Sequence, residues 1–385
     1  MTLDLATAVL PGAALHRHLA ELRERDPVAR VRFGGQPAWL LTRHADVEAA
    51  FRDEQTFPAG ENYRRSIEPL QGPTFESMDG PPHRLYRNLT TPAFRSRAVD
   101  RFEADGIVTL AHELADRVEH AGSPVDLVEE FTGRYPFLVI TRLLGIPREA
   151  EDDFRHWATR ILRYNRDRPA AERAAAEFRS YLAPVLTERR RSPRDDVISE
   201  LTTAEVDGTR LTDAELVSHV IALFTAGTTT TSDGTGNLLF ALLTHPDALD
   251  EVRATPDARP AGIEELLRWE SPVSILPRIA PAGARIAGVT VPEEGRVLFG
   301  LAAANRDPTM FDAPDRFDPR RDTTRALTFG LGTHSCPGFH LARREMRVAL
   351  DVLLDRFPAL RLCDADDATP RGAIQRGPQR LVVEW

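Results

Sequence analysis

Hydrophobic spacing along the chain predicts two early strands and then helices over most of the remaining length. Alternating segments at 28–33 and 38–42 flank a Gly-Gly pair, which indicates a β-hairpin, and a short helix is expected over 45–52. Residues 58–82 are rich in Pro, Gly and polar side chains without periodicity, so we predict a long loop, of the kind that is usually functional or mobile. Helices are expected after it over residues 83–94, 97–120, 126–143, 147–163, 169–189, 212–245, 246–254, 261–269 and 339–356.

The later strands are few and short. They are expected over residues 286–291, 296–300, 360–363 and 381–384. The chain has no internal repeat and no linker long enough to separate two domains. The pattern therefore predicts an α+β fold that is predominantly α-helical, in a single domain over residues 1–385.

The helix expected over 212–245 is the longest of the chain. Thr212 and Glu215 have the spacing of a capping box, and Pro246 ends the pattern. Thirty-odd helical residues span about 50 Å, the width of a domain. Both ends of the segment are apolar nearly all round, so we expect the helix to be buried.

The middle of this helix, residues 226–236, has a poor helical composition. It holds three glycines within a run of Thr, Ser and Asp, which costs on the order of 6 kcal/mol relative to alanine. One interpretation is functional: Gly227 lets another group approach the backbone, and the Thr hydroxyls divert helix carbonyls. The alternative is a kinked core helix in which each Thr hydroxyl bonds the carbonyl four residues earlier.

Charge and composition exclude several classes of protein. Lys and Arg total 49 and Asp and Glu total 58, a formal net charge of −9, which argues against a general nucleic-acid binder. The first twenty residues contain no apolar run of signal or anchor length, and no other window reaches about 18 apolar residues. We expect a soluble, cytoplasmic protein without a membrane partner. Two cysteines cannot build a disulfide framework.

The segment around Cys336 carries the strongest chemical signal. Glycines permit a loop that presents one thiol, and a helix follows from about residue 339. The unpaired N–H groups of that helix would lower the pKa of the thiol. Without Cys or His partners at zinc spacing this is no structural zinc site. Taken alone, an isolated cysteine such as Cys336 would by default be a buried inert thiol.

The pattern Phe-Gly-x-Gly-x-His-x-Cys-x-Gly over 329–338 resembles the haem-binding signature of the cytochrome P450 family. Further motifs of that family follow in the same order along the chain: Ala226 and Gly227 with Thr230 and Thr231, Glu265-x-x-Arg268, and residues 304–308 followed by Phe311 and Phe317. The resemblance covers the whole chain. It implies the cytochrome P450 fold, with a long central helix over haem b and a small β-sheet region, and a monomeric oxidoreductase of the soluble bacterial type.

The resemblance also implies roles for residues on the cysteine side of the haem. Cys336 would be the axial thiolate ligand of the iron, Phe329 would pack near it and restrict water, and Gly338 completes the signature. Four cationic or donor residues match the family's partners of the haem propionates: His83, Arg87, Arg278 and His334. Cys363, in a predicted strand, is expected to play no part.

On the opposite side, Ala226 and Gly227 would line the oxygen pocket, and Thr230 would be the alcohol that donates a hydrogen bond there. The position before this Thr commonly carries an acid, and here it holds Thr229. A proton relay through a carboxylate at that point therefore cannot be carried over.

A structural ion pair is implied farther from the haem. Glu265 and Arg268 would form it, with a third cation from Arg321 or Arg316. Breaking one member of such a buried network costs several kcal/mol, so we assign these residues to folding and haem retention.

The implied activity is insertion of one oxygen atom from O2 into a hydrophobic organic substrate, by hydroxylation or epoxidation in secondary or catabolic metabolism. Electrons would come from a ferredoxin and its NAD(P)H-dependent reductase, because no flavin or iron–sulfur segment is present. We expect the ferredoxin to dock at exposed cations near the haem: Arg84, Arg343, Arg344 and Arg347.

Two alternatives remain at this stage. One is a peroxide-driven or radical-coupling haem-thiolate enzyme that needs less of the proton relay. The other is a non-catalytic relative that acts as a partner protein. Family members that assist glycosyltransferases have lost the ligand cysteine, whereas Cys336 stands here in an intact loop.

Overall fold

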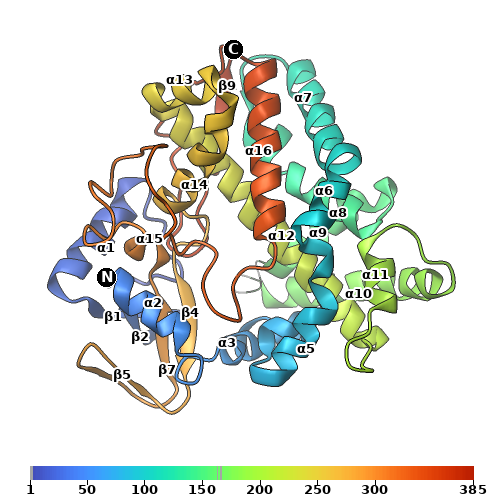
Figure 1. Ribbon diagram of the computed structural model, residues 1–385, viewed down its shortest axis with the longest axis horizontal. Coiled ribbons are helices and arrows are strands. Elements are labelled where there is room, and N and C mark those ends of the chain that lie inside the picture. The colour runs from blue at the N-terminus through green and yellow to red at the C-terminus, as the bar shows by residue number, and fades with distance from the viewer. Residues whose placement is uncertain (1–2, 163, 165–166) are drawn as a thin grey trace.

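The computed structural model describes residues 3–162, 164 and 167–385. Helices form most of the molecule; the strands labelled β1, β2, β4, β5 and β7 lie beside the N-terminal helices, whereas β9 lies near the C-terminus (Figure 1). No helix in the described ranges is both long enough and apolar enough to cross a membrane. The helices are α1 (Ala13–Arg25), α2 (His44–Arg52), α3 (Ala59–Ser66), α4 (Glu68–Gln71), α5 (Gly80–Thr90), α6 (Ser96–Phe102), α7 (Thr109–Ala121), α8 (Tyr135–Leu144), α9 (Glu151–Leu162), α10 (Arg168–Arg191), α11 (Val197–Thr203), α12 (Asp213–Thr244), α13 (Pro246–Ala254), α14 (Arg259–Trp269), α15 (Leu301–Ala304) and α16 (Phe339–Arg356).

The strands form three small sheets. A four-stranded sheet has the order β1-β2-β7-β4, in which only the β2–β7 pair is parallel. The glycines between β1 and β2 both have positive φ, as the predicted hairpin requires. The strands are β1 (Val28–Phe33), β2 (Gln36–Leu41), β3 (Val125–Asp126), β4 (Leu276–Ala280), β5 (Ala284–Ile286), β6 (Val289–Val291), β7 (Gly295–Phe299), β8 (Arg361–Leu362) and β9 (Val382–Glu384).

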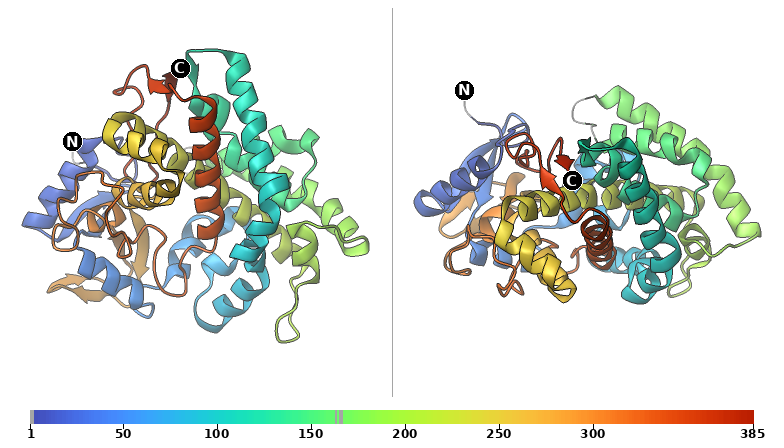
Figure 2. Two further views of the ribbon diagram at one scale, coloured as in Figure 1. Left: turned by 45° about the horizontal axis from the view of Figure 1, so that its top comes forward. Right: turned by 90° about the horizontal axis from the view of Figure 1, so that it is seen from above.

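The long helix α12 has the predicted bounds and the predicted cap. The Thr212 side chain accepts a hydrogen bond from the Glu215 amide, and the Glu215 carboxylate accepts one from the Thr212 amide at 2.8 Å. These two bonds satisfy donors that a helix start otherwise leaves unpaired. The helix crosses the middle of the molecule and packs against α8 on one side and α16 on another (Figure 2).

The long loop predicted over 58–82 is wrong. The segment contains α3, α4 and a 3₁₀ turn (Phe75–Ser77). Arg64 bonds Glu61 within α3 and also reaches the Ser77 carbonyl at 2.7 Å, and Arg179 of α10 donates to the Leu70 carbonyl. Ion pairs and contacts with distant elements hold these short helices, so hydrophobic periodicity could not reveal them.

Three other expectations also need correction. The strand expected over 286–291 is the hairpin β5–β6, because Ala287 and Gly288 adopt positive φ between the strands. The helix expected over 97–120 is interrupted by a π-helical segment at Glu103–Val108. The helix expected over 126–143 begins only at Tyr135, after β3 and a π-helical segment at Val128–Thr132. Residue 163, the expected end of another helix, lies outside the described residues. Besides α3 and α4, the sequence analysis missed α1, α11, α15, β3 and β4.

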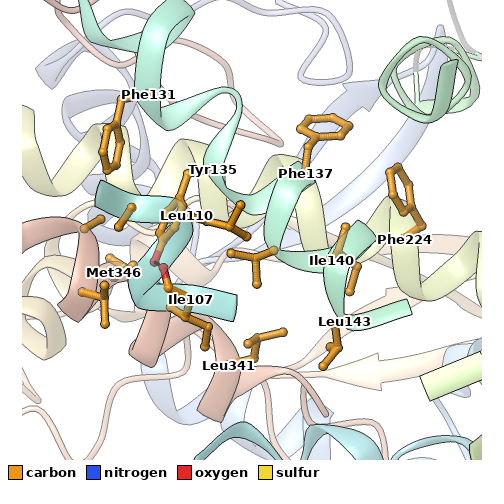
Figure 3. Close-up of a cluster of buried hydrophobic side chains, with 14 of the residues drawn as sticks. Ile107, Leu110, Phe131, Tyr135, Phe137, Ile140, Leu143, Phe224, Leu341 and Met346 are labelled. Atoms are coloured by element: carbon orange, nitrogen blue, oxygen red, sulfur yellow. Dashed lines mark hydrogen bonds between the residues drawn. The ribbon is translucent and has the colours of Figure 1, made fainter. Parts of the chain in front are cut away.

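The main core lies where α7, α8, α12 and α16 meet. Figure 3 shows side chains from these helices turned toward one another, and the Tyr135 hydroxyl donates to the Ile107 carbonyl at 3.0 Å. Burial of each large apolar side chain stabilises the fold by about 1.5–3 kcal/mol. The core thus fixes α12 and α16 relative to each other, and α16 begins directly after the loop that carries Cys336.

Candidate active site

The loop over 329–338 is a tight turn that leads into α16. Gly330 and Gly332 have φ of +68° and +76°, a conformation that other residues adopt only with strain. The amide of Cys336 donates to the Phe329 carbonyl at 2.8 Å, which closes the turn. These two glycines of the sequence motif are therefore required by backbone geometry.

Neighbouring elements hold this loop in place. Glu54, just after α2, accepts hydrogen bonds from the amide and the hydroxyl of Thr333 at 2.8 and 2.7 Å. Arg87 of α5 donates to the Ser335 carbonyl at 2.6 Å. The guanidinium of Arg343 lies 4.7 Å from the centre of the Phe329 ring. Segments distant in sequence thus fix the position of the thiol.

The Cys336 thiol is half-buried, and its pKa is raised by burial. The Gly338 amide and the charges of Arg87 and Arg343 oppose this shift, while Glu76 adds to it. The sequence analysis expected a lowered pKa; the net direction is the reverse, because desolvation outweighs the single amide of the helix start. Cys363 is exposed at the end of β8.

Two imidazoles stack beside this loop. The rings of His83 and His334 lie 3.8 Å apart at an angle of 24°. Within the described ranges, neither nitrogen of His83 has a hydrogen-bond partner, and Nε2 of His334 has none either; Asp79 lies 3.6 Å from it, beyond hydrogen-bond length. Burial lowers the pKa of His83 to about 4, with further lowering from His334 and Arg87.

Arg278 is almost fully buried on β4. The one hydrogen bond of its guanidinium to a described residue goes to the carbonyl of the preceding residue, Pro277, at 3.0 Å. Its charge also lies 5.5 Å from the Phe299 ring, and burial lowers its pKa. Arg278 and His334 line one small pocket. Arg278 and His83 therefore have no acidic partner within ion-pair distance among the described residues, whereas His334 has Asp79.

The middle of α12 is unusual in its exposure. Every residue from 216 to 225 is buried, yet Ala226 is exposed and Gly227 is half-exposed with only Ile140 nearby. The helix thus faces interior space at this point. No hydrogen bond or ion pair between described residues joins this part of α12 to the Cys336 loop.

Some threonines of α12 bond helix carbonyls four residues earlier, as expected for a core helix. The hydroxyl of Thr230 donates to the Ala226 carbonyl at 2.8 Å, and Thr225 and Thr235 make the same bond one turn before and after it. The helix runs through this segment without a break. Thr229 differs, because its buried hydroxyl has no hydrogen-bond partner among the residues with described positions.

The Glu265 network is closed. Glu265 and Arg268 are fully buried and joined by two hydrogen bonds of 2.7 and 2.8 Å, and Arg321 adds a third contact at 3.2 Å. The Asp318 amide donates to the same carboxylate at 2.9 Å. Arg316, the other candidate for the third cation, pairs with Asp318 at the surface and contributes only its carbonyl oxygen here.

A second buried network escaped the sequence analysis. Glu270, just after α14, bonds Arg376 at 2.6 Å and His16 of α1 at 3.0 Å. Burial raises the pKa of Glu270, but the charges of His16, Arg376 and Arg306 together lower it to about 2. No motif marks these residues, since they come together from both ends of the chain.

Three ionisable residues near the site were also missed. Tyr63 and Glu76 lie in the segment predicted to be a loop, and Asp233 lies one turn after Thr230 on α12. Burial raises the pKa of Glu76 and of Asp233 to about 7. It raises the pKa of Tyr63 to about 12, with contributions from Glu76 and Cys336. No sequence signal separates them from surface residues.

Most of the arginines expected to form the ferredoxin docking surface make ion pairs within the chain. Arg343 binds Glu264, Arg344 binds Asp100 and Glu103, and Arg347 binds Asp351. Arg84 is exposed at the surface of α5.

Comparison with known proteins gives one consistent result. The family model for cytochrome P450 matches residues 153–257 and 260–373. Cytochrome P450 107B1 of Saccharopolyspora erythraea is 37% identical, covering 96% of this chain and 94% of that protein. Mycinamicin IV hydroxylase/epoxidase of Micromonospora griseorubida is 35% identical, covering 97% of this chain and 96% of that protein.

A solved structure supports the same assignment. The cytochrome P450 PksS of the Bacillus subtilis bacillaene polyketide synthase is 31% identical, with a TM-score of 0.89 and coverage of 96% of each chain. The helix-rich α+β architecture with small sheets is that of the family. The chain therefore belongs to the cytochrome P450 family and is a monooxygenase-type oxidoreductase whose cofactor is haem b.

Proposed function

We propose that this enzyme binds haem b through Cys336 and inserts one oxygen atom from O2 into a hydrophobic organic substrate. The observation that carries the proposal is a thiol on a rigid turn, placed beside two buried donors, Arg278 and His83, that have no acidic partner within ion-pair distance in the described chain. Hydroxylation or epoxidation is the expected outcome, as in the similar protein named a hydroxylase/epoxidase.

The residues present fit the cofactor. His83, His334 and Arg278 offer unused buried donors, which are the partners that two propionates need. Arg87 bonds the Ser335 carbonyl and has further donors to offer. Phe329 lies against the loop under the Arg343 guanidinium and would exclude water from the thiolate. One domain over residues 1–385, acting as a monomer, would suffice for this chemistry.

The chain's own part in the reaction lies on α12. Haem supplies oxygen activation when bound, and a thiolate ligand favours O–O cleavage. Ala226 and Gly227 leave interior space beside the helix, and Thr230 holds a hydroxyl at its edge. Because Thr229 cannot carry a charge near neutral pH, protons would arrive through water ordered by the Thr229 and Thr230 hydroxyls, or through a polar group of the substrate.

Electrons would come from a ferredoxin and an NAD(P)H-dependent reductase. Arg343, Arg344 and Arg347 are each about one-third exposed, so they remain accessible although each has an acidic partner. Together with exposed Arg84 they would attract an acidic ferredoxin through interactions that salt weakens.

The deciding experiment is the absorption spectrum of the reduced protein with carbon monoxide. We expect the red-shifted Soret band of a thiolate-ligated haem, which Cys336→Ala should abolish. Cys363→Ser is the matched control, because that thiol is exposed and distant in sequence, and it should leave the band intact. An unchanged band in the Cys336 variant would disprove the ligand assignment.

One observation favours a second candidate, a peroxide-driven enzyme. Thr229 replaces the acid that the O2-dependent route commonly uses, and its hydroxyl has no hydrogen-bond partner among the described residues. Feeding hydrogen peroxide in place of O2 and reductant separates the two. Product formation at an equal or higher rate with peroxide would support this candidate.

A further inference from the structure

Glu76 lies in the 3₁₀ turn between α4 and α5. The residues on either side, Phe75 and Ser77, are buried, and hydrogen bonds fix the turn: the Phe75 amide donates to Nε2 of His219 at 3.1 Å, and the Ser77 hydroxyl to the Thr74 carbonyl at 3.0 Å. The Glu76 side chain is half-exposed although it is strongly desolvated. It therefore faces enclosed space rather than bulk solvent.

The neighbours of Glu76 leave its carboxylate without a counter-charge. Its one hydrogen bond within the described part of the chain comes from the Gln71 amide at 3.3 Å, and no described Lys, Arg or His lies within ion-pair distance. Burial raises its pKa to about 7, and the Gln71 hydrogen bond opposes that shift. A buried carboxyl without a charged partner is available to bind a ligand.

The enclosed space next to Glu76 is the proposed active site. Glu76 raises the pKa of the Cys336 thiol and of the Tyr63 phenol, and Tyr63 in turn is influenced by Cys336 and by Arg278 of β4. These groups come from the turn, from α3, from β4 and from the cysteine loop. The turn packs against α3, which holds Tyr63, and against α5, and the Phe75 ring lies 6.2 Å from the His83 ring and 5.9 Å from the Arg87 guanidinium. The turn that carries Glu76 therefore borders residues proposed to hold the haem.

We propose that Glu76 and the neighbouring Tyr63 form a subsite for a positively charged group of the substrate, an ammonium or a guanidinium. The proposal rests on the proposed function, since it concerns the same pocket. A carboxylate and a phenol ring are the pair that recognises cations in enclosed sites.

A cation suits this position better than a neutral donor. Arg87 donates to the Ser335 carbonyl and Arg278 to the Pro277 carbonyl, and both are proposed partners of the propionates. The Glu76 carboxylate is therefore left without a cationic partner among the described residues. When a cation binds, the protonated fraction of Glu76 loses its proton to the buffer, so binding and proton release are coupled.

Two probes of matched shape test this in the haem-loaded protein. Benzyltrimethylammonium carries the charge and cannot ligate iron, and neopentylbenzene is its neutral isostere. Their dissociation constants are read from the Soret shift. We expect the ammonium to bind at least tenfold more tightly than the isostere, and Glu76→Gln to remove that preference.

Calorimetry supplies a readout that a merely structural role would not change. Titrations at pH 7 in two buffers of different ionisation enthalpy should show net release of protons on binding of the ammonium, as expected for a carboxyl whose pKa burial has raised. Glu76→Gln should release none. Tyr63→Leu should weaken the ammonium severalfold and leave the proton release in place.

The controls separate this inference from the function on which it rests. Glu293→Gln removes an exposed acid and should change neither probe, while Glu76→Asp should keep part of the preference. If the carbon monoxide spectrum lacks the thiolate band, the proposed function fails. If the band is present but the ammonium binds no better than its isostere, or Glu76→Gln weakens both probes equally, the cation subsite is disproved.

Discussion

Arg268 in the Glu265 network and Arg278 near Cys336 are both buried, but only Arg268 has an anion as partner within the described chain. Arg268 and Arg321 share one carboxylate, and Arg268 fills its remaining donors with the carbonyls of Asn305 and Pro314. Arg278, by contrast, bonds only a neighbouring carbonyl among described groups. Buried side chains whose hydrogen bonds are all made within the chain therefore stabilise the fold, whereas buried side chains with unused donors are candidates for binding a ligand.

The largest effect should follow from removing the carboxylate at the centre of the Glu265 network. Glu265→Gln keeps the shape but leaves two buried guanidiniums without an anion, so we expect a loss of about 3–5 kcal/mol in the free energy of unfolding. Urea unfolding followed by circular dichroism measures it. Arg316→Gln removes a surface pair only and should change stability by less than about 1 kcal/mol. Equal effects of the two substitutions would remove the distinction between the networks.

A pH titration tests the second closed network. Because the pKa of Glu270 is lowered to about 2 from 4.5, its contribution is present above pH 4.5 and is lost as the pH falls toward 2. A shift of this size corresponds to about 3 kcal/mol. Burial lowers the pKa of His16 to about 4, so stability also declines between pH 6.5 and 4.

We expect Glu270→Gln to unfold at lower urea concentration at neutral pH and to lose less stability on acidification below pH 4.5 than the parent protein. Glu264→Gln, which removes a partly exposed pair, is the control and should keep the parent's acid slope. A parent-like slope in the Glu270 variant would show that the acid sensitivity arises elsewhere.

Removing Arg278, a buried donor near Cys336, should weaken haem retention rather than the stability of the haem-free protein. Arg278→Met deletes a buried charge that has no anion among the described residues, so the haem-free protein should change by less than about 1 kcal/mol. Haem transfer to apomyoglobin should become about tenfold faster, equivalent to about 1.4 kcal/mol. Arg285→Met, at an exposed position of β5, should change neither quantity. A destabilised haem-free protein with normal haem loss would contradict the comparison.

The smallest expected effect on stability concerns α12. Thr230→Ala removes a hydroxyl that only bonds its own helix, so the free energy of unfolding should change by less than about 1 kcal/mol. Hydrogen peroxide released per NAD(P)H consumed should rise severalfold and product yield should fall. Thr235→Ala removes the same bond one turn farther on and should leave the yield unaffected. Unchanged coupling in both variants would move proton delivery away from this helix.

Local signals in the sequence were sufficient for part of the molecule. The Thr212–Glu215 capping box marks the start of α12, and Pro246 marks its end. The glycines of the 329–338 motif define the cysteine loop. Each of these signals acts through the local backbone. The α+β class and the long helix followed from those signals and from periodicity.

Contacts between distant segments could not be obtained in that way. The short helices α3 and α4 depend on Arg64 and Arg179, and the Glu270 network joins residues 16 and 376. The sequence motif located Cys336 but predicted the wrong direction for its pKa, since desolvation depends on the whole surrounding fold.

Arg376 also ties the N-terminal segment to the end of the chain. Its guanidinium donates to the carbonyls of Leu10 and Gly12, and the Gly12 amide donates to the Pro370 carbonyl. Residues 4 and 5 bond residues 32–35, but the carbonyls of Leu10 and Gly12 gain these partners only from residues 370–376. During synthesis the contact between residues 10–12 and the 370–376 segment can therefore form only after the intervening residues have been made.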